Sequence, residues 1–531
     1  MHQRLASLAS TFFAGSPLRH AAYRAFYAGS IGAALGYTMQ TTVAAWMMAT
    51  LTPSPVMVAL VQTASTAPAL VFGLVAGAMG DIVDRRRIIV ATQVVLMATT
   101  ALLGVAALFG LAGPATLLAL TFVIGSAFVF YQPAQGSSVN DLVSRAELSQ
   151  AVSLNAVAFN VSRAIGPALA GALAAGIGVG TTLLASSVFF LAMIAAAQSL
   201  PVRPPAHLGV PERLLSGVQS GVRYVRHSPA MRAFIIRTLS FTACASALWA
   251  LLPVIARDQL GLGAGGFGFL IGMFGVGAVT GAIAIPSQLA ARTLNRTVFS
   301  GMVLWAAASV LVASTREVVF AAAGAFGCGA AWVTVHASLS TGTQSTAPAW
   351  VRTRAVAINL VSVQACLALG SPLWGAIASA SDTRIALALS AALLLTLVLL
   401  NRRVRVRMGS EADVTPGTYD ALGIDEEPGP DDGPVLIQIE YQIDPPDRDA
   451  FVAAIRRVGP TRRRNGATSW RVFRAIGVEG RYVERYVVES WAEYLRLRAR
   501  MTMADRAVLS QAQDLQSSEV PLRVSRFIGV D

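Results

Sequence analysis

Polar side chains inside long apolar stretches are the residues of this chain that could bind or carry a ligand. A polar or charged group in hydrocarbon is costly, so such residues usually face a cavity or a neighbouring helix. The candidates for a substrate cavity or for ion coupling are Gln40, Gln62, Tyr131, Gln132, Asn155, Asn160, Arg163, His336 and Gln364. None of them is a carboxylate, and no acid lies in the middle of an apolar stretch.

Two of these candidates carry or can carry a charge. Arg163 is the one charge well inside an apolar stretch of the first half of the chain. It could pair with an anionic substrate or with Asp81, or it could snorkel or donate to carbonyl groups of a neighbouring helix. His336 has an ordinary pKa of about 6.5, which suits proton exchange. Asp81 and His336 are therefore the two candidate proton carriers.

Other chemistries lack the residues that they need. Cys244, Cys328 and Cys366 lie in apolar stretches, and their spacing fits no metal motif. We interpret them as small buried hydrophobic residues. No nucleotide-binding loop occurs, which argues against an ATP-driven pump. We expect no metal ion, no cofactor and no enzymatic activity.

The elements that hold these residues are predicted from the low charge content. Only 13% of the 531 residues are charged, whereas a soluble globular chain carries about 25%. Crossing a membrane takes about 20 apolar residues. Runs of about that length occur at 22–49, 56–80, 88–110, 114–138, 150–175, 181–200, 233–256, 266–289, 297–314, 317–341, 355–379 and 383–401. We predict an all-α membrane protein with twelve transmembrane helices in two six-helix halves.

The arginines predict the orientation of these helices. Numbered alternately from the N-terminus, one set of loops holds 20 arginines, and the other holds only Arg257, Arg316 and Arg384. Cytoplasmic loops are enriched in basic residues. We therefore predict a multi-pass protein of the inner (plasma) membrane with both termini in the cytoplasm. The same rule explains the net charge of +13 without nucleic-acid binding.

The two halves repeat each other at a shift of 204 residues. Asn155 then overlies Asn359, Gly166 overlies Gly370 and Gly171 overlies Gly375. In the same alignment His336 overlies Gln132, so both could face a central cavity. Parallel repeats related by an axis along the membrane normal are a transporter architecture, with the substrate site near the midplane between the halves.

The region between the halves and the C-terminal region have a different character. In 201–231, Leu215, Val218, Val222 and Val225 recur at helical spacing, which predicts an amphipathic helix on the cytoplasmic face. Residues 408–433 are rich in Gly, Pro and acids and are predicted to be a flexible linker. The remainder predicts strands at 435–441, 469–476, 481–490 and 522–528, with helices at 447–458, 491–500 and 503–514. This order predicts an α+β ferredoxin-like soluble domain.

One loop carries a family signature. Between the second and third apolar runs, Gly77 is followed by Asp81, Asp84, Arg85 and Arg86. This segment resembles the loop motif of the major facilitator superfamily, in which a charged pair can lock one state of a rocking transporter. Ile82 and Asp84 depart from the usual pattern. The equivalent loop of the second half, 286–296, has no acid, so a charge lock is expected on one side only.

Two further segments refine the resemblance. Gly166, Pro167 and Gly171 on the fifth run resemble the glycine–proline motif of proton-coupled antiporters in that superfamily, which implies export. Close packing against Gly272, Gly275, Gly277 and Gly281 of the eighth run is the alternative explanation. The layout of residues 20–405, with the segments 462–467, 482–484 and 489–495, resembles the enterobactin-exporter-like branch and its transmembrane secretion effector members.

The predicted domains follow from these boundaries. They are an N-terminal six-helix half (1–200), a cytoplasmic loop (201–231), a C-terminal six-helix half (232–407), a linker (408–433) and a cytoplasmic ferredoxin-like domain (434–531). The expected partners are a small-molecule substrate, protons, the lipid bilayer and a second copy bound through the C-terminal domain.

Three functions remain open from the sequence. The first is a secondary active transporter that exports a drug, a siderophore or another natural product by proton antiport with alternating access. The second is a transporter regulated by a dimerising or ligand-sensing C-terminal domain, which is compatible with the first. The third is a membrane-anchored, monooxygenase-like enzyme, although the tail shows no cofactor motif.

Overall fold

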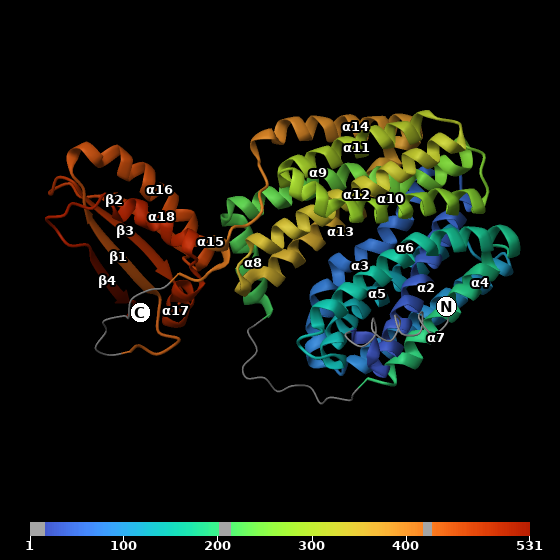
Figure 1. Ribbon diagram of the computed structural model, residues 1–531, viewed down its shortest axis with the longest axis horizontal. Helices are drawn as coiled ribbons and strands as arrows, with labels where there is room; N and C mark the ends of the chain where they lie inside the picture. Colours follow the sequence, from blue (N-terminus) through green and yellow to red (C-terminus); the bar gives the residue numbers. More distant parts are fainter. Residues whose placement is uncertain (1–15, 201–213, 418–426, 531) are drawn as a thin grey trace, which may run out of the picture. The chain divides into compact units, whose positions relative to one another are not determined.

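The computed structural model of the protein describes residues 16–200, 214–417 and 427–530. Most of them are helical, and one four-stranded sheet lies near the C-terminus (Figure 1). The long helices of the first half are α2 (Ala21–Leu51), α3 (Pro55–Ile82), α4 (Arg85–Leu108), α5 (Pro114–Leu142), α6 (Leu148–Ile177) and α7 (Val179–Ala197). Those of the second half are α9 (Pro229–Val254), α10 (Ala264–Ala291), α11 (Leu294–Ser314), α12 (Val318–Thr346), α13 (Ala349–Ala380) and α14 (Thr383–Leu400).

Eleven helices of the described residues are long and apolar enough to cross a membrane. They include every long helix just named except α2, which has 31 residues but is less apolar. Its middle carries Thr38, Gln40, Thr41 and Thr42. The chain is therefore a multi-pass membrane protein, and a twelfth span at α2 stays a prediction.

Helix ends coincide with ordinary chain breakers and caps. Pro114 begins α5, and Gly178, with a φ of +88°, separates α6 from α7. Asp84 accepts a hydrogen bond from the Arg86 amide over 2.9 Å and so caps α4. Asp382 caps α14 in the same way. The helix ends are thus set by capping and helix-breaking residues as well as by the length of the apolar runs.

The chain packs as two compact units. The first comprises 1–210, 238–338 and 361–403, and the second comprises 211–237, 339–360 and 404–531. The first unit contains α2–α7, which form the blue-to-green bundle in Figure 1, and the greater part of the second half. The second contains α8 (Leu214–His227), the adjoining ends of α9, α12 and α13, and the C-terminal sheet.

Small residues bring helices of the two halves together twice, in equivalent places. A Cβ on Gly171 of α6 would lie 2.6 Å from the Cα of Gly268 on α10. A Cβ on Gly375 of α13 would lie 2.7 Å from the Cβ of Ala59 on α3. The 204-residue shift relates α6 to α13, and α3 and α10 are the second helices of their halves. The sequence repeat is therefore also a repeat of helix contacts.

A second pair of glycines continues this pattern within each half. Gly166 of α6 leaves no room for a Cβ beside the hydroxyl of Thr38 on α2. Its equivalent, Gly370 of α13, leaves none beside the hydroxyl of Ser246 on α9. In lipid there is no hydrophobic driving force between helices, so close van der Waals packing of helix backbones at small residues holds them together.

Helix α8 lies in the segment for which the sequence predicts an amphipathic helix. Ser220, Gly221 and Tyr224 are buried, whereas Val222 is 50% exposed. The packed face therefore lies beside the predicted apolar face, which includes Val225. The side chains of Leu215 and Val218 lie outside the described residues, so contact of that apolar face with a membrane surface stays a prediction.

The C-terminal sheet is antiparallel. Strands β1 (Val435–Gln442), β2 (Ser469–Arg474), β3 (Arg481–Val488) and β4 (Arg523–Ile528) lie in the order β2-β3-β1-β4. Alternate residues of β1 are buried, and they share a core with Phe451, Ile455 and Val458 of α16 (Arg448–Asn465). Helices α17 (Trp491–Arg500) and α18 (Met503–Gln513) add Leu497 and Leu509 to the same core.

Two segments near this domain differ from the sequence prediction. Helix α16 continues past Gly459 to Asn465, because Gly459 packs under the Trp470 ring and the turn at Gly466 comes later, with a φ of +147°. Within the predicted flexible linker, Ser410 and Asp413 form a capping box that starts α15 (Glu411–Val414). Residues 418–426 of that linker lie outside the described residues.

The contact of α6 with α10 predicts that two glycine-to-alanine substitutions on α6 differ in their effect on stability. In Gly171→Ala the new methyl group would overlap Gly268, so we expect a loss of about 1–3 kcal/mol from overpacking. In Gly176→Ala on the same helix no atom lies within 4 Å of the new Cβ, so we expect a neutral or slightly stabilising effect. Thermal unfolding in detergent measures both, and equal melting temperatures would contradict the close contact.

Candidate functional site

Arg163 lies near the middle of α6 and is partly exposed. Its guanidinium carbon is 5.9 Å from the ring centre of Phe159 and 5.9 Å from that of Trp249 on α9. Such distances permit cation–π attraction. Among the described residues, no carboxylate forms an ion pair with Arg163. The first unit thus holds a positive charge between aromatic rings.

Helices α9–α12 supply a continuous group of rings, which we call the aromatic cluster. Its members are Phe241, Trp249, Phe274, Trp305, Trp332 and His336. Trp332 is central: its ring centre lies 5.5 Å from that of Trp249 and 4.2 Å from that of His336. His336 also places Nε2 3.5 Å from the Thr242 hydroxyl.

The first half contributes a smaller group of rings. Tyr37 of α2 and Phe128 of α5 are stacked with ring centres 3.8 Å apart and an interplanar angle of 6°. Tyr131 lies one helical turn from Phe128, at 6.1 Å. With Phe159 of the first half and Trp249 of the second half beside its guanidinium, Arg163 lies near rings from both halves.

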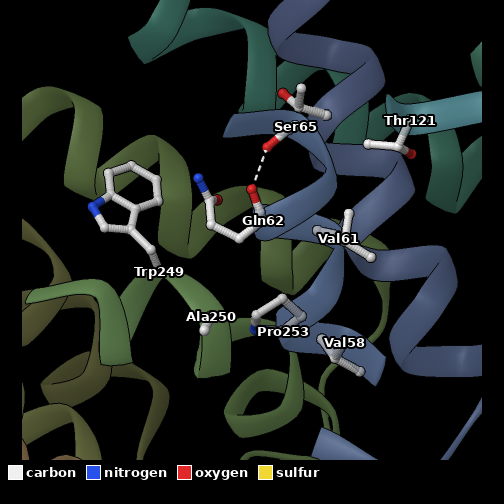
Figure 2. Close-up of a pocket in the computed structure, with 10 residues that line it drawn as sticks. Val58, Val61, Gln62, Ser65, Thr121, Trp249, Ala250 and Pro253 are labelled. Atoms are coloured by element: carbon white, nitrogen blue, oxygen red, sulfur yellow. Dashed lines mark hydrogen bonds between the residues drawn. The ribbon is translucent and has the colours of Figure 1, made fainter. Parts of the chain in front are cut away.

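A small cavity adjoins this group (Figure 2). It is lined by Thr41, Ala45, Val58, Val61, Gln62, Ser65, Thr121, Trp249, Ala250 and Pro253, and encloses about 330 Å³ of empty space, part of it open. Figure 2 shows the Gln62 amide pointing toward the Trp249 ring, while the Ser65 hydroxyl donates to the Gln62 carbonyl over 2.8 Å. The cavity thus combines apolar walls with an amide and hydroxyl groups.

The other candidate residues are dispersed. Gln40 is fully buried and Asn155 and Gln364 are half-buried, whereas Gln132 and Asn160 are exposed. Tyr131 belongs to the ring group of the first half. Of the nine candidates, Gln62, Arg163 and His336 are connected through Trp249 and Trp332.

Sequence reasoning missed the rings that connect these residues. Trp249, Trp305 and Trp332 each lie inside an apolar run, and that placement was the available signal. The list of polar residues in apolar runs also omitted Gln93, which is fully buried on α4, and Arg237. Arg237 is 2% exposed on α9 and donates to the Val404 carbonyl over 3.2 Å.

The loop motif after α3 has a defined ionic contact. Arg85, at the start of α4, pairs with Asp141 near the end of α5, with Nη1 and Oδ2 2.8 Å apart, and it also donates to the Ser137 carbonyl. Asp84 serves as the cap of α4. Asp81 lies in the last turn of α3, and its side chain is outside the described residues.

Glu147 forms a second ionic contact, at the loop before α6. The Ser144 hydroxyl donates to its carboxylate over 2.7 Å, and Arg19 lies 2.9 Å from the same carboxylate. The hydrogen bond from Ser144, followed by those with His20 and the positive charge of Arg19, lowers the pKa of Glu147 to about 2. Glu147 therefore ties the start of α2 to the loop between α5 and α6.

In the second unit Glu493 of α17 is shared by three arginines. Its carboxylate lies 3.0 Å from Arg223 of α8, 2.7 Å from Arg496 and 2.6 Å from Arg500. Burial raises the pKa of Glu493, but the charge of Arg500 and hydrogen bonds from Arg496 and Arg500 outweigh it, so the pKa is lowered. The guanidinium of Arg500 also lies 4.6 Å from the Trp350 ring centre, at the start of α13. We call these contacts the Glu493 latch.

The core of the C-terminal domain contains a buried ion pair. Glu484 of β3 is fully buried and accepts hydrogen bonds from Arg462, Trp470 and Tyr441 at 3.0, 3.0 and 3.1 Å. Both oxygens of this carboxylate thus accept hydrogen bonds from side chains of the same domain. Within the part of the chain that the structure describes, no group of three or more His, Cys, Asp or Glu side chains could hold a metal ion.

Comparisons with known proteins agree with this architecture. A family model described as "transmembrane secretion effector" matches residues 10–531. The chain is 27% identical over 207 residues to the multidrug efflux pump Tap of Mycolicibacterium fortuitum, in a match that covers 37% of this chain and 50% of Tap. The chain therefore spans about half the length of this relative.

Solved structures show the same fold at low sequence identity. A bacterial homologue of the human lysosomal transporter Spinster, in an inward-facing and unoccupied conformation, matches with a TM-score of 0.60 and 13% identity, covering 72% of this chain and 97% of that one. The nucleoside transporter NupG matches with a TM-score of 0.61 and 12% identity, covering 72% of this chain and 99% of NupG.

The lowered pKa of Glu147 predicts a pH-dependent contribution to stability. A carboxyl group whose pKa falls on folding stabilises the protein above its ordinary pKa of 4.5, and this stabilisation is lost as the pH falls through about 2. We expect Glu147→Gln to lower the melting temperature at pH 7 and to differ progressively less from the unmodified protein between about pH 5 and pH 2.

Thermal unfolding of the full chain in detergent across this pH range provides the measurement. Glu317→Gln is the matched control, because Glu317 is an exposed loop acid. A difference between Glu147→Gln and the unmodified protein that stays constant down to pH 2 would contradict the assignment.

Proposed function

The chain belongs to the transmembrane secretion effector family of the major facilitator superfamily, and from this premise we propose that it exports small molecules by proton antiport with alternating access. It is a membrane transporter by family and fold. The repeated contacts α6–α10 and α13–α3 support the proposal most directly, because they join two similar halves around Arg163 and the adjoining cavity. A drug, a siderophore or another natural product is the proposed cargo.

Contacts between the halves favour a cavity that is closed on one side. In the first unit, Thr63 donates to the Ala368 carbonyl over 2.8 Å and Arg257 donates to the Thr52 carbonyl over 3.0 Å. Thr52 precedes α3 and Arg257 precedes α10, so these contacts lie toward one end of the helices. Farther along α3, no atom lies within 4 Å of a Cβ built on Gly73 or Gly77. Opening toward the arginine-rich loops is consistent with this asymmetry.

The topology completes the proposal. We propose that α2 is the twelfth span, because its length of 31 residues exceeds what a bilayer requires. With twelve spans and arginine-rich loops inside, both termini lie in the cytoplasm of a cell bounded by this plasma membrane. The domain boundaries stated from the sequence, including the ferredoxin-like domain at 434–531, remain part of this proposal. The element order and the strand order β2-β3-β1-β4 support that domain assignment.

The transport proposal is tested in inside-out membrane vesicles that contain the full chain. A panel of fluorescent dyes of both charge signs is offered while a proton gradient is imposed. We expect at least one dye to accumulate above vesicles without the protein and to leak back when a protonophore collapses the gradient. Absence of accumulation for every dye, at several gradients, would overturn the function. Asp81→Asn and His336→Gln, assayed for substrate-induced proton movement, separate the two candidate proton carriers.

We also propose that Gly77, Asp81, Asp84, Arg85 and Arg86 form the conformational lock, and that Gly166, Pro167 and Gly171 form the antiporter-like helix motif. The contact of Arg85 with Asp141 supports the first role, because it joins α4 to α5 at the arginine-rich side. The packing of Gly171 on Gly268 is equally compatible with a purely structural second motif.

The lock predicts a charge-swap result. In Asp141→Arg two positive charges face each other, so we expect transport to fall by about tenfold or more, which corresponds to roughly 1.4 kcal/mol. In the double variant Arg85→Asp/Asp141→Arg the attraction returns, so we expect partial recovery of the transport rate. Arg87→Ala, an exposed neighbour, should transport at the normal rate. A double variant no better than Asp141→Arg would contradict the ionic contact as the cause.

A second candidate function is regulation of transport by the C-terminal domain, supported by the Glu493 latch. The latch connects α17 to α8 and, through Arg500 and Trp350, to the start of α13. Since α13 also carries Gly375, a change in the domain could bias the helix that joins the halves. Dimerisation or ligand sensing by the domain would act through the same contacts. The enzyme alternative has less support, because the tail shows no cofactor motif. Tyr494 in that tail packs on Trp491 and accepts a hydrogen bond from Arg526, which is a structural role.

The latch predicts a specific loss of coupling. In Glu493→Gln three arginines lose their shared negative charge, so we expect the domain to be more accessible to limited proteolysis and the transport rate to change at least twofold. Glu489→Gln is the matched control, because Glu489 is an exposed acid close by on the chain. Unchanged proteolysis together with unchanged transport would remove this second candidate.

A further inference from the structure

Arg163 carries a charge that the described part of the transporter leaves without a counter-charge. Asp84, Asp141, Glu147, Asp258, Glu317 and Asp382 all lie at helix ends or in loops. Asp81 is in the last turn of α3, whereas Arg163 is 15 residues into α6, about 22 Å along the helix axis from its start. Because α3 ends where α6 begins on the arginine-rich side, this depth separates Arg163 from Asp81.

The guanidinium is nevertheless placed to meet a ligand. Its helix neighbours Ser162 and Gly166 pack on Thr38 of α2, and Ala164 packs on Gly275 of α10. Arg163 itself is partly exposed and lies against Trp249, which also lines the cavity of Figure 2. A charged group at this depth cannot face lipid without a large penalty, so it faces the space between the halves.

The surroundings of Arg163 favour flat, unsaturated groups. Trp249, a member of the aromatic cluster, and Phe159 each have their ring centre 5.9 Å from the guanidinium carbon of Arg163. Offset stacking on such rings is favourable for planar ligands. Gln62 adds amide donor and acceptor groups beside Trp249. A guanidinium binds carboxylate, sulfonate or phosphate groups in a bidentate manner, and it can donate to the single oxygen of a phenolate.

We propose that the Arg163 site selects organic anions that carry a flat aromatic or conjugated ring system. This inference rests on the proposed transport function and adds the charge and shape of the cargo. A cation of the same shape would meet the positive field of Arg163 with no carboxylate nearby to compensate, so the site disfavours it. The selection is for charge sign first and for planarity second.

Two dyes on one scaffold test the proposal, with binding and transport as separate readouts. Fluorescein is an anionic xanthene and rhodamine 6G is a cationic xanthene. Binding to the purified full chain in detergent is followed by fluorescence anisotropy, with protein-free micelles as the blank, and transport is followed in inside-out vesicles. We expect fluorescein to bind at least tenfold more tightly than rhodamine 6G.

Variants assign the preference to the two side chains. In Arg163→Gln we expect fluorescein affinity to fall about 10- to 100-fold, since a charge-assisted hydrogen bond is lost, and rhodamine 6G affinity to stay or rise. Arg163→Lys keeps the charge and should retain most fluorescein binding. Trp249→Leu should weaken both dyes, whereas Trp249→Phe should weaken them less. Arg145→Gln, on an exposed loop, is the control and should bind both dyes normally.

The outcomes separate this inference from the function on which it rests. Tight fluorescein binding that depends on Arg163, without transport of any dye, would sink the transport function and leave the anion site standing. Transport of rhodamine 6G, with fluorescein affinity unaffected by Arg163→Gln, would overturn the anion site and leave transport standing. Failure of both dyes to bind would also overturn it.

Discussion

Close approach of helix backbones at small residues is the contact on which the membrane part of this protein depends. In hydrocarbon, apolar side chains gain little by leaving lipid for one another, so helices associate through packing and polar contacts. Gly171 against Gly268 and Gly375 against Ala59 provide such packing at two equivalent places. A larger residue at any of them would separate the halves.

This arrangement determines where polar chemistry can be located. Where two helices touch at small residues, the larger side chains lie to either side of the contact. On α6 the residue next to Ala164, which packs on Gly275 of α10, is Arg163. The rings of Trp249 and Phe159 lie beside this guanidinium, whose exposure to lipid would be costly. The aromatic cluster continues from Trp249 to His336, so a proton-carrying candidate and a positive charge belong to one connected group.

Most of the fold could be predicted from the sequence, because spans depend on composition and length. The apolar runs coincide with the long helices, and the alternation in 435–441 coincides with the alternating burial of β1. Helix α2 shows the limit of this reasoning: Thr38, Gln40, Thr41 and Thr42 make it less apolar, although it packs with the others. Helix α16 shows another limit, since Gly459 and Pro460 resemble a stop locally, yet the Trp470 ring fills the space over Gly459.

The site was predicted only in part, for a physical reason. Arg163, Gln62 and His336 are conspicuous as polar residues in apolar runs, but their connection through Trp249 and Trp332 is a tertiary packing of apolar residues that has no periodic signal. The pair Arg85–Asp141 was also invisible, because the motif placed the expected acid at Asp81 and not on α5.

The two units of the chain differ in how their buried charges are balanced. In the first unit Arg163, inside a membrane span, has no described carboxylate as a partner. In the second unit the carboxylate of Glu493 contacts three guanidinium groups. A cation without a counter-charge in a low-dielectric site binds an external anion favourably. A carboxylate that is shared by several cations already has its counter-charge within the protein. An anion bound at the proposed Arg163 site would therefore supply the counter-charge that the described residues of the first unit do not.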